Sequence, residues 1–89
     1  MYSDKFFAAE INPHTVTIDL HESYTIVDAL EQLEKELFLV FNRGEKYCRV
    51  VHGIGTGRLA DAVHEALTKN PLVLDWQESE QGGSCLVIF

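Results

Sequence analysis

The run VVHGIGTGRL from Val50 to Leu59 most constrains what this chain can fold into, because an apolar segment ends there in a turn with glycine at every second position. Gly53, Gly55 and Gly57 tolerate positive φ, so the run predicts a strand, a tight turn and then a helix. The unpaired N–H groups and the dipole of a helix N-terminus favour an anion. We therefore predict a phosphate-binding loop. Its expected binding residues are Gly53, Gly55, Thr56, Gly57 and Arg58.

The other segments alternate over short strands or repeat at helical spacing. The first helix is expected to follow Thr25, which forms a capping box with Asp28, and to stop at Asn42-Arg43-Gly44, where Gly44 suits a left-handed cap. The second helix should run from residue 58 to residue 70. The expected strands are 15–20, 47–52, 73–78 and 85–89, of which 47–52 is nearly all apolar and should lie inside the sheet.

This βαβαββ order predicts an α/β fold, a two-layer sandwich of a mixed four-stranded sheet and two helices. A right-handed crossover makes the first two strands parallel, so that their C-terminal ends meet at one edge of the sheet. Asp19 and His21 end the first strand, and His52 ends the second. Because ligand sites of open α/β sheets form at such an edge, we expect these three side chains to converge there.

The chain of 89 residues is long enough for one domain. We expect residues 1–14 to be an N-terminal tail, because they show no sustained period and Asn12-Pro13 signals a turn, and residues 15–89 to be the domain. Phe6 and Phe7 either pack on the domain or belong to an interaction segment. No segment has the apolar length of a membrane span or a secretory signal, so we expect a cytoplasmic protein.

The net charge of −7 argues against a protein that coats nucleic acid by charge alone. The basic residues are nevertheless concentrated near the glycine turn in the sequence. This is either a basic island around the loop or a chance alternation on a solvated surface. The basic residues concerned are Arg43, Lys46, Arg49 and Arg58.

Cys48 and Cys85 lie in strand-like segments without a Cys-x-x-Cys spacing, which favours buried free thiols over a disulfide or a metal pair. His64 stands beside the apolar stripe of the second helix, at least one turn beyond the loop. We therefore expect His64 to be structural or merely exposed.

The set Asp19, His21 and His52 fits three kinds of site: an acid–base set for phosphodiester cleavage, a metal site, or a phosphate clamp. Two histidines and an aspartate suffice for zinc, but no short His-x-x-x-His spacing assembles them, so we assign no metal ligand and keep a divalent metal as an alternative cofactor. A fourth alternative is that the histidines only cap strand ends. The loop lacks a Walker lysine and a complete Gly-x-Gly-x-x-Gly fingerprint, which disfavours ATP and NAD.

Two motifs of this chain resemble those of the Smr (small MutS-related) domain family. Ile18-Asp19-Leu20-His21 is similar to its Leu-Asp-Leu-His motif, and the run from His52 to Gly57 is similar to its His-Gly-x-Gly-x-Gly motif. Gly82-Gly83 lies near the position of the family's terminal Gly-Gly hairpin, so the resemblance covers about residues 15–89. In three places a residue common in the family is replaced, which lowers the positive charge at the expected nucleic-acid face. The replacements are Glu22, Ile54 and Ala60.

The resemblance implies a fold similar to the C-terminal domain of translation initiation factor three, and DNA-nicking or RNA endonuclease activity with a link to DNA repair. It carries over as site residues Asp19, His21, His52, Gly53, Gly55 and Gly57. We accordingly predict a domain that binds DNA or RNA and acts as an endonuclease. The alternative is a non-catalytic adaptor for nucleic acid, a ribosome or a protein partner such as a larger MutS-type chain.

Overall fold

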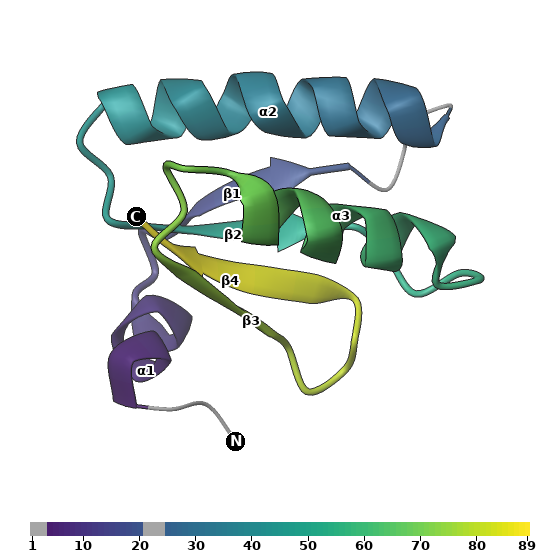
Figure 1. Cartoon of the computed structure of the whole chain (residues 1–89). Helices are drawn as coiled ribbons and strands as arrows, with labels where there is room; N and C mark the ends of the chain where they lie inside the picture. Colours follow the sequence, from purple (N-terminus) through teal and green to yellow (C-terminus); the bar gives the residue numbers. More distant parts are fainter. Residues whose placement is uncertain (1–3, 21–24) are drawn as a thin grey trace.

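The computed structural model describes residues 4–20 and 25–89, and in them a four-stranded sheet is covered by helices (Figure 1). The strand and helix types follow the predicted βαβαββ order, with one additional helix in front of it. The α/β fold with a mixed sheet is therefore confirmed. The elements are α1 (Asp4–Ile11), β1 (Val16–Asp19), α2 (Ile26–Asn42), β2 (Tyr47–Val51), α3 (Arg58–Lys69), β3 (Asp75–Glu78) and β4 (Ser84–Ile88).

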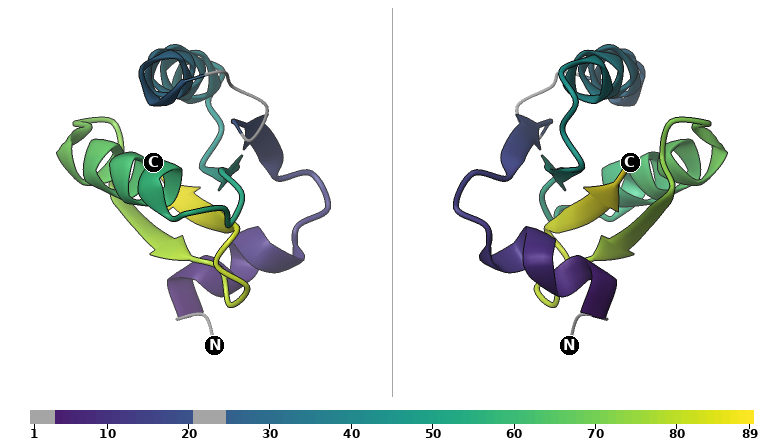
Figure 2. Two further views of the ribbon diagram at one scale, coloured as in Figure 1. Left: turned by 90° about the vertical axis from the view of Figure 1, so that its right-hand side faces the viewer. Right: turned by 90° about the vertical axis from the view of Figure 1, so that its left-hand side faces the viewer.

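The sheet has the strand order β1-β2-β4-β3, with β1 and β2 parallel and the other two pairs antiparallel. The parallel first pair and the interior position of β2 are as the sequence predicted. Helices α2 and α3 cover one face of the sheet and α1 lies against the other (Figure 2). Because side chains alternate along a strand, Cys48 and Val50 of β2 point into the core below α2 and α3, where both are fully buried.

The caps of α2 follow the sequence signals. The Oγ1 atom of Thr25 accepts a hydrogen bond from the Asp28 backbone N–H at 3.0 Å, which satisfies one of the unpaired donors at the start of the helix. Gly44 has a φ of 83° just beyond the last turn, where an L side chain would be strained. Buried side chains then recur at helical spacing and turn one face of α2 to the sheet. They are Ala29, Leu33, Leu37 and Val40.

Residues 4–11 form a helix that the sequence did not predict. An isolated eight-residue helix is unstable in water, so packing must hold α1 in place. Phe6 is only 2% exposed and forms a small second core with Ala9 and Leu86. This decides between the two alternatives for Phe6, whereas Phe7 is 57% exposed. The division into a tail (1–14) and a domain (15–89) stays a prediction.

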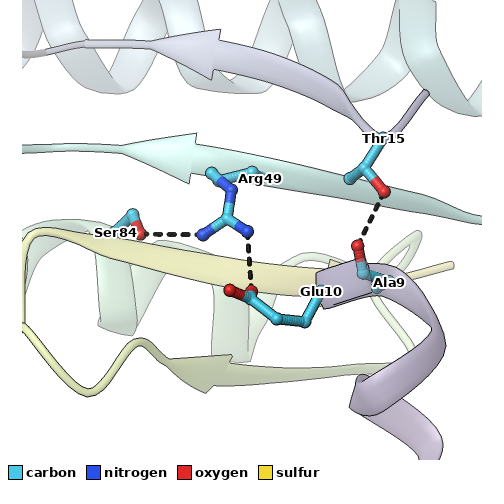
Figure 3. Close-up of polar contacts among 5 residues, drawn as sticks. All are labelled: Ala9, Glu10, Thr15, Arg49 and Ser84. Atoms are coloured by element: carbon cyan, nitrogen blue, oxygen red, sulfur yellow. Dashed lines mark hydrogen bonds and ion pairs between the residues drawn. The ribbon is translucent and has the colours of Figure 1, made fainter. Parts of the chain in front are cut away.

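Polar contacts complete the docking of α1 (Figure 3). The Arg49 guanidinium donates to Glu10 Oε2 at 2.7 Å and to Ser84 Oγ at 3.3 Å, which links α1, β2 and β4. The Thr15 hydroxyl donates to the Ala9 carbonyl at 2.8 Å, which fixes the chain between α1 and β1. Arg49 is thus a structural residue on the face that α1 covers.

The basic island expected around the glycine loop does not form. Arg43 follows α2 and Lys46 precedes β2, so both lie at the N-terminal end of β2, whereas the loop follows its C-terminal end. A five-residue strand separates these ends by roughly 17 Å. Arg49 is engaged by Glu10, which leaves Arg58 as the one member of the set beside the loop. Among the helices of the described ranges, none has the length and apolar content to cross a membrane.

Candidate nucleic-acid interface

The glycine loop between β2 and α3 is a tight turn whose shape depends on its glycines. Gly53, Gly55 and Gly57 have φ values of 76°, 44° and 86°, all in the region that L side chains rarely adopt. The Gly57 N–H donates to the Ile54 carbonyl at 3.1 Å and closes the turn. A Cβ built on Gly55 or Gly57 would meet no atom within 4 Å, so the outer side of the loop is open to another molecule.

The loop presents backbone donors that the fold leaves unused. In the part of the chain that the structure describes, the amides of Ile54, Gly55 and Thr56 meet no acceptor. Helix α3 begins with Gly57 as its N-cap and has no side-chain cap from that residue, and among the described residues the amides of Leu59 and Ala60 also meet no acceptor. Consecutive free N–H groups in such a turn form an anion-binding concavity. The loop therefore has donor groups of the kind that the predicted phosphate binding requires.

Side chains at the loop add one positive charge and one hydroxyl. Arg58 and Thr56 are both exposed, and Arg58 forms no ion pair with a residue of the described segments. The Arg58 amide lies 3.5 Å from Thr56 Oγ1, which orients the threonine toward the helix end. Ile54 is 67% exposed at the centre of the loop, so an apolar side chain accompanies the backbone donors.

The Gly82-Gly83 turn of the β3–β4 hairpin supports the loop. The amides of His52 and Gly53 both donate to the Gly83 carbonyl, at 3.1 and 3.0 Å. A Cβ on Gly83 would lie 3.7 Å from Ile54 Cγ1, so the hairpin and the loop are in contact. The two glycine segments of the sequence thus form one structural unit.

Asp19 and His52 lie at adjoining strand ends but on opposite faces of the sheet. The parallel register pairs Asp19 with Val51, so alternation places the Asp19 side chain on the face of Val51 and that of His52 on the other. Their exposure agrees, since Asp19 is exposed and His52 is only 3% exposed. His21 lies outside the described residues.

His52 occupies a buried position with a contact at each ring nitrogen. Its Nδ1 lies 2.8 Å from the carbonyl oxygen of Gly53, and its Nε2 lies 3.5 Å from Cys85 Sγ. Nδ1 therefore carries the proton and donates to Gly53, and the Nε2 lone pair faces the thiol. In this arrangement His52 fixes the start of the glycine loop and does not itself face the open side.

His64 is a neighbour of His52 that the sequence did not reveal. The two rings meet edge to face with centroids 5.5 Å apart, and His64 also stacks on Trp76 with centroids 4.6 Å apart. Its Nε2 lies 4.0 Å from Glu78 Oε1. The sequence does show that His64 lies beside the apolar stripe of α3. It does not show which strands that stripe covers, because this depends on the strand order of the sheet.

Cys48 and Cys85 are free, buried thiols, as the sequence predicted. Burial raises the pKa of Cys48 to about 12. Burial and the Glu78 carboxylate together raise the pKa of Cys85 to about 12. Both sulfurs are therefore protonated at neutral pH when no other group binds them.

The fold and the two glycine segments define a member of the Smr domain family. The family's sequence model matches residues 18–88, and the chain belongs to this family. The crystal structure of the Smr domain of Thermus thermophilus MutS2 superimposes with a TM-score of 0.77 at 28% identity, and the match covers 83% of this chain and 96% of that one.

Curated relatives are proteins named endonuclease MutS2. The chain is 41% identical to that of Halothermothrix orenii over 75 residues, which are 81% of this chain and 9% of the relative. It is 39% identical to that of Aquifex aeolicus over 62 residues, which are 67% of this chain and 8% of the relative. The chain thus spans less than a tenth of the length of these relatives, and the homology concerns their Smr domains.

Proposed function

We propose that this Smr domain binds the sugar–phosphate backbone of DNA or RNA at the glycine loop and the first turn of α3. The observation that carries the proposal is the set of backbone amides, from Ile54 to Thr56 and at Leu59 and Ala60, that meet no acceptor among the described residues. Phosphate oxygens are the acceptors that such a donor array fits, and Arg58 adds the matching charge.

Because the chain is acidic, binding is expected to depend on contacts at the loop and not on the overall charge of the molecule. At a net charge of −7 the molecule as a whole repels a polyanion, so affinity has to come from short-range contacts at the loop. Exposed Ile54 suits contact with an unstacked base or a sugar, which favours single-stranded or branched nucleic acid over a smooth duplex.

Binding is tested by fluorescence anisotropy with labelled single-stranded and branched DNA and structured RNA over a range of salt concentrations. Arg58→Ala should weaken binding to every substrate and lower the salt slope by about one unit, because one phosphate contact is lost. Lys46→Ala is the matched control, since Lys46 is also exposed but lies at the other end of β2, and it should leave the salt slope unchanged. Failure of the wild type to bind at low salt refutes the proposal.

A second candidate function is endonuclease activity, which the names of the MutS2 relatives favour. On this proposal His21 and His52 serve as acid and base, and Asp19 orients or assists. Because the Asp19 and His52 side chains lie on opposite faces of the sheet, Asp19 does not orient His52 by direct contact. The burial of His52 behind its own loop means that cleavage needs the loop to open or needs His52 in a supporting role. A divalent metal as cofactor stays an alternative.

Incubation with plasmid DNA and structured RNA, with and without divalent metals, separates this candidate from the adaptor alternative. Asp19→Asn, His21→Ala and His52→Gln should each reduce cleavage, with circular dichroism to confirm that the variants fold. If wild type and variants leave every substrate equally intact while binding persists, the domain is a non-catalytic adaptor for nucleic acid, a ribosome or a MutS-type partner. Cytoplasmic location and a role in DNA repair belong to the same proposal.

A further inference from the structure

Four side chains able to bind a metal meet on the helix-covered face of the sheet, behind the glycine loop. His52 follows β2, Cys85 lies in β4, Glu78 ends β3 and His64 lies in α3. The register pairs Cys85 with both Val50 and Glu78, so these strands direct their side chains to the same face. We propose that His52, His64 and Cys85, with Glu78 as the fourth ligand, form a zinc site.

The spacing of the donor atoms suits zinc. One ring nitrogen from each histidine and Cys85 Sγ lie within 4.8 Å of one another. Tetrahedral zinc with Zn–N of about 2.0 Å and Zn–S of about 2.3 Å separates nitrogen from sulfur by about 3.6 Å. The distance from His52 Nε2 to Cys85 Sγ is already 3.5 Å, so these two atoms need no movement. A shift of about 1 Å by His64 completes the set of three.

His52 is oriented as a metal ligand. Its Nδ1–H donates to the Gly53 carbonyl at 2.8 Å, which leaves the lone pair on Nε2 and aims it at Cys85. Histidines that bind metals usually hold their second nitrogen in this way, because the hydrogen bond fixes the tautomer and the ring plane.

His64 contributes an unsatisfied donor atom. Among the residues that the structure describes, His64 Nε2 is the one buried side-chain nitrogen or oxygen without a hydrogen-bond partner. Leaving such an atom unpaired is costly, and a metal ion would remove the cost. The ring contacts both His52 and Trp76, and the Trp76 indole is itself fixed by its hydrogen bond to Thr68 Oγ1 at 3.0 Å.

The ligand set selects a borderline-soft ion. Two imidazoles and a thiolate favour zinc over magnesium, calcium or manganese, which prefer oxygen. On binding, a Zn–S bond forms, the S–H bond of Cys85 breaks and its proton passes to solvent, while both neutral imidazoles keep their protons. The thiolate and the Glu78 carboxylate then balance the two positive charges of the ion, so no net charge is buried. Zinc on Nε2 also takes the lone pair that His52 would need as a general base.

Cobalt(II) reports on the site without any nucleic acid, so the result is independent of the proposed binding function. Titration of the reduced full chain with Co²⁺ should give a thiolate-to-cobalt charge-transfer band and the visible bands of tetrahedral cobalt, saturating at one equivalent. One equivalent of Zn²⁺ should abolish these bands. Zn²⁺ should also raise the thermal midpoint, whereas Mg²⁺ should leave it unchanged.

The chain offers a matched control for each variant. Cys85→Ser should lose the charge-transfer band, and Cys48→Ser should keep it, because Cys48 is an equally buried thiol outside the cluster. His64→Gln should weaken Co²⁺ binding by at least about tenfold, and His14→Gln, at an exposed position outside the cluster, should not. Circular dichroism checks each fold, and His64→Gln carries the test if Cys85→Ser does not fold.

Absence of a thiolate-to-cobalt band in the wild type overturns the site, whatever the variants do. So does a band that survives Cys85→Ser in a folded protein, or Co²⁺ affinity that His64→Gln leaves unchanged.

Discussion

Replacing Phe6 by alanine tests whether α1 is part of the folded unit. The Phe6 side chain is 2% exposed and packs with Ala9 and Leu86. A buried phenylalanine removes about 200 Å² from water, and at about 25 cal/mol per Å² this corresponds to an upper bound of about 5 kcal/mol. Alanine keeps part of that area, so Phe6→Ala should lower the free energy of unfolding by about 3 kcal/mol, within the range for such substitutions in cores.

The decrease in the free energy of unfolding caused by Phe6→Ala has an upper limit, because α1 can undock while the sheet stays folded. If docking of α1 contributes less than about 3 kcal/mol, the measured loss equals that docking free energy and α1 is released first. Urea unfolding followed by Trp76 fluorescence reports on the sheet, and hydrogen exchange of the amides in residues 8–12 reports on α1. The urea midpoint should fall by roughly 2 M, or the α1 amides should lose their protection.

Phe7→Ala is the matched control, because Phe7 is the adjacent residue of the same helix but is 57% exposed. Its effect should stay within about 0.5 kcal/mol. Equal stability and equal α1 protection in Phe6→Ala and Phe7→Ala would refute the packing of α1 described above.

Three further outcomes follow from local features. Gly57→Ala should lower the free energy of unfolding by about 1–2 kcal/mol, because its φ of 86° strains an L residue. Gly83→Ala should be tolerated, since a Cβ there meets only an ordinary contact. Urea unfolding of the two variants measures the difference. The hydrogen bond from Lys5 holds the pKa of Asp75 below its ordinary 3.8. The ionised carboxylate therefore stabilises the folded state above the ordinary pKa, and this stabilisation disappears as the pH falls through the lowered pKa. Asp75→Asn should accordingly reduce the acid sensitivity of the urea midpoint. The two cysteines should resist iodoacetamide in the native protein and react in denaturant, as mass spectrometry would show.

Local signals were sufficient to predict the central elements of this fold. The Thr25 cap, the apolar stripe of α2 and the glycines after β2 each act within a few residues, so periodicity and capping rules reveal them. The docking of α1 was not accessible in this way. Phe6 is buried in α1 because distant parts of the chain, chiefly Leu86 eighty positions later, supply the surface on which the helix packs.

The candidate site was only partly predictable for the same reason. Sequence order brought Asp19 and His52 to one edge of the sheet, but the parallel register assigns their side chains to opposite faces. Conversely, no spacing links His52 to Cys85 and His64. Their proximity depends on β4 pairing with β2, a long-range choice that the sequence left open.

The structure also changes the expected effect of Ile54 on nucleic-acid binding. A lysine at this position, common in the family, would add a charge, so isoleucine suggested a weakened site. The loop's donors, however, are backbone amides whose positions are set by the positive φ of Gly53, Gly55 and Gly57. These amides are present whatever side chain stands between them, and the hydrogen bonds from His52 and Gly53 to the Gly83 carbonyl hold them in place. Phosphate recognition by this loop is therefore expected to depend on the three glycines and on the hairpin behind them more than on the residue at position 54.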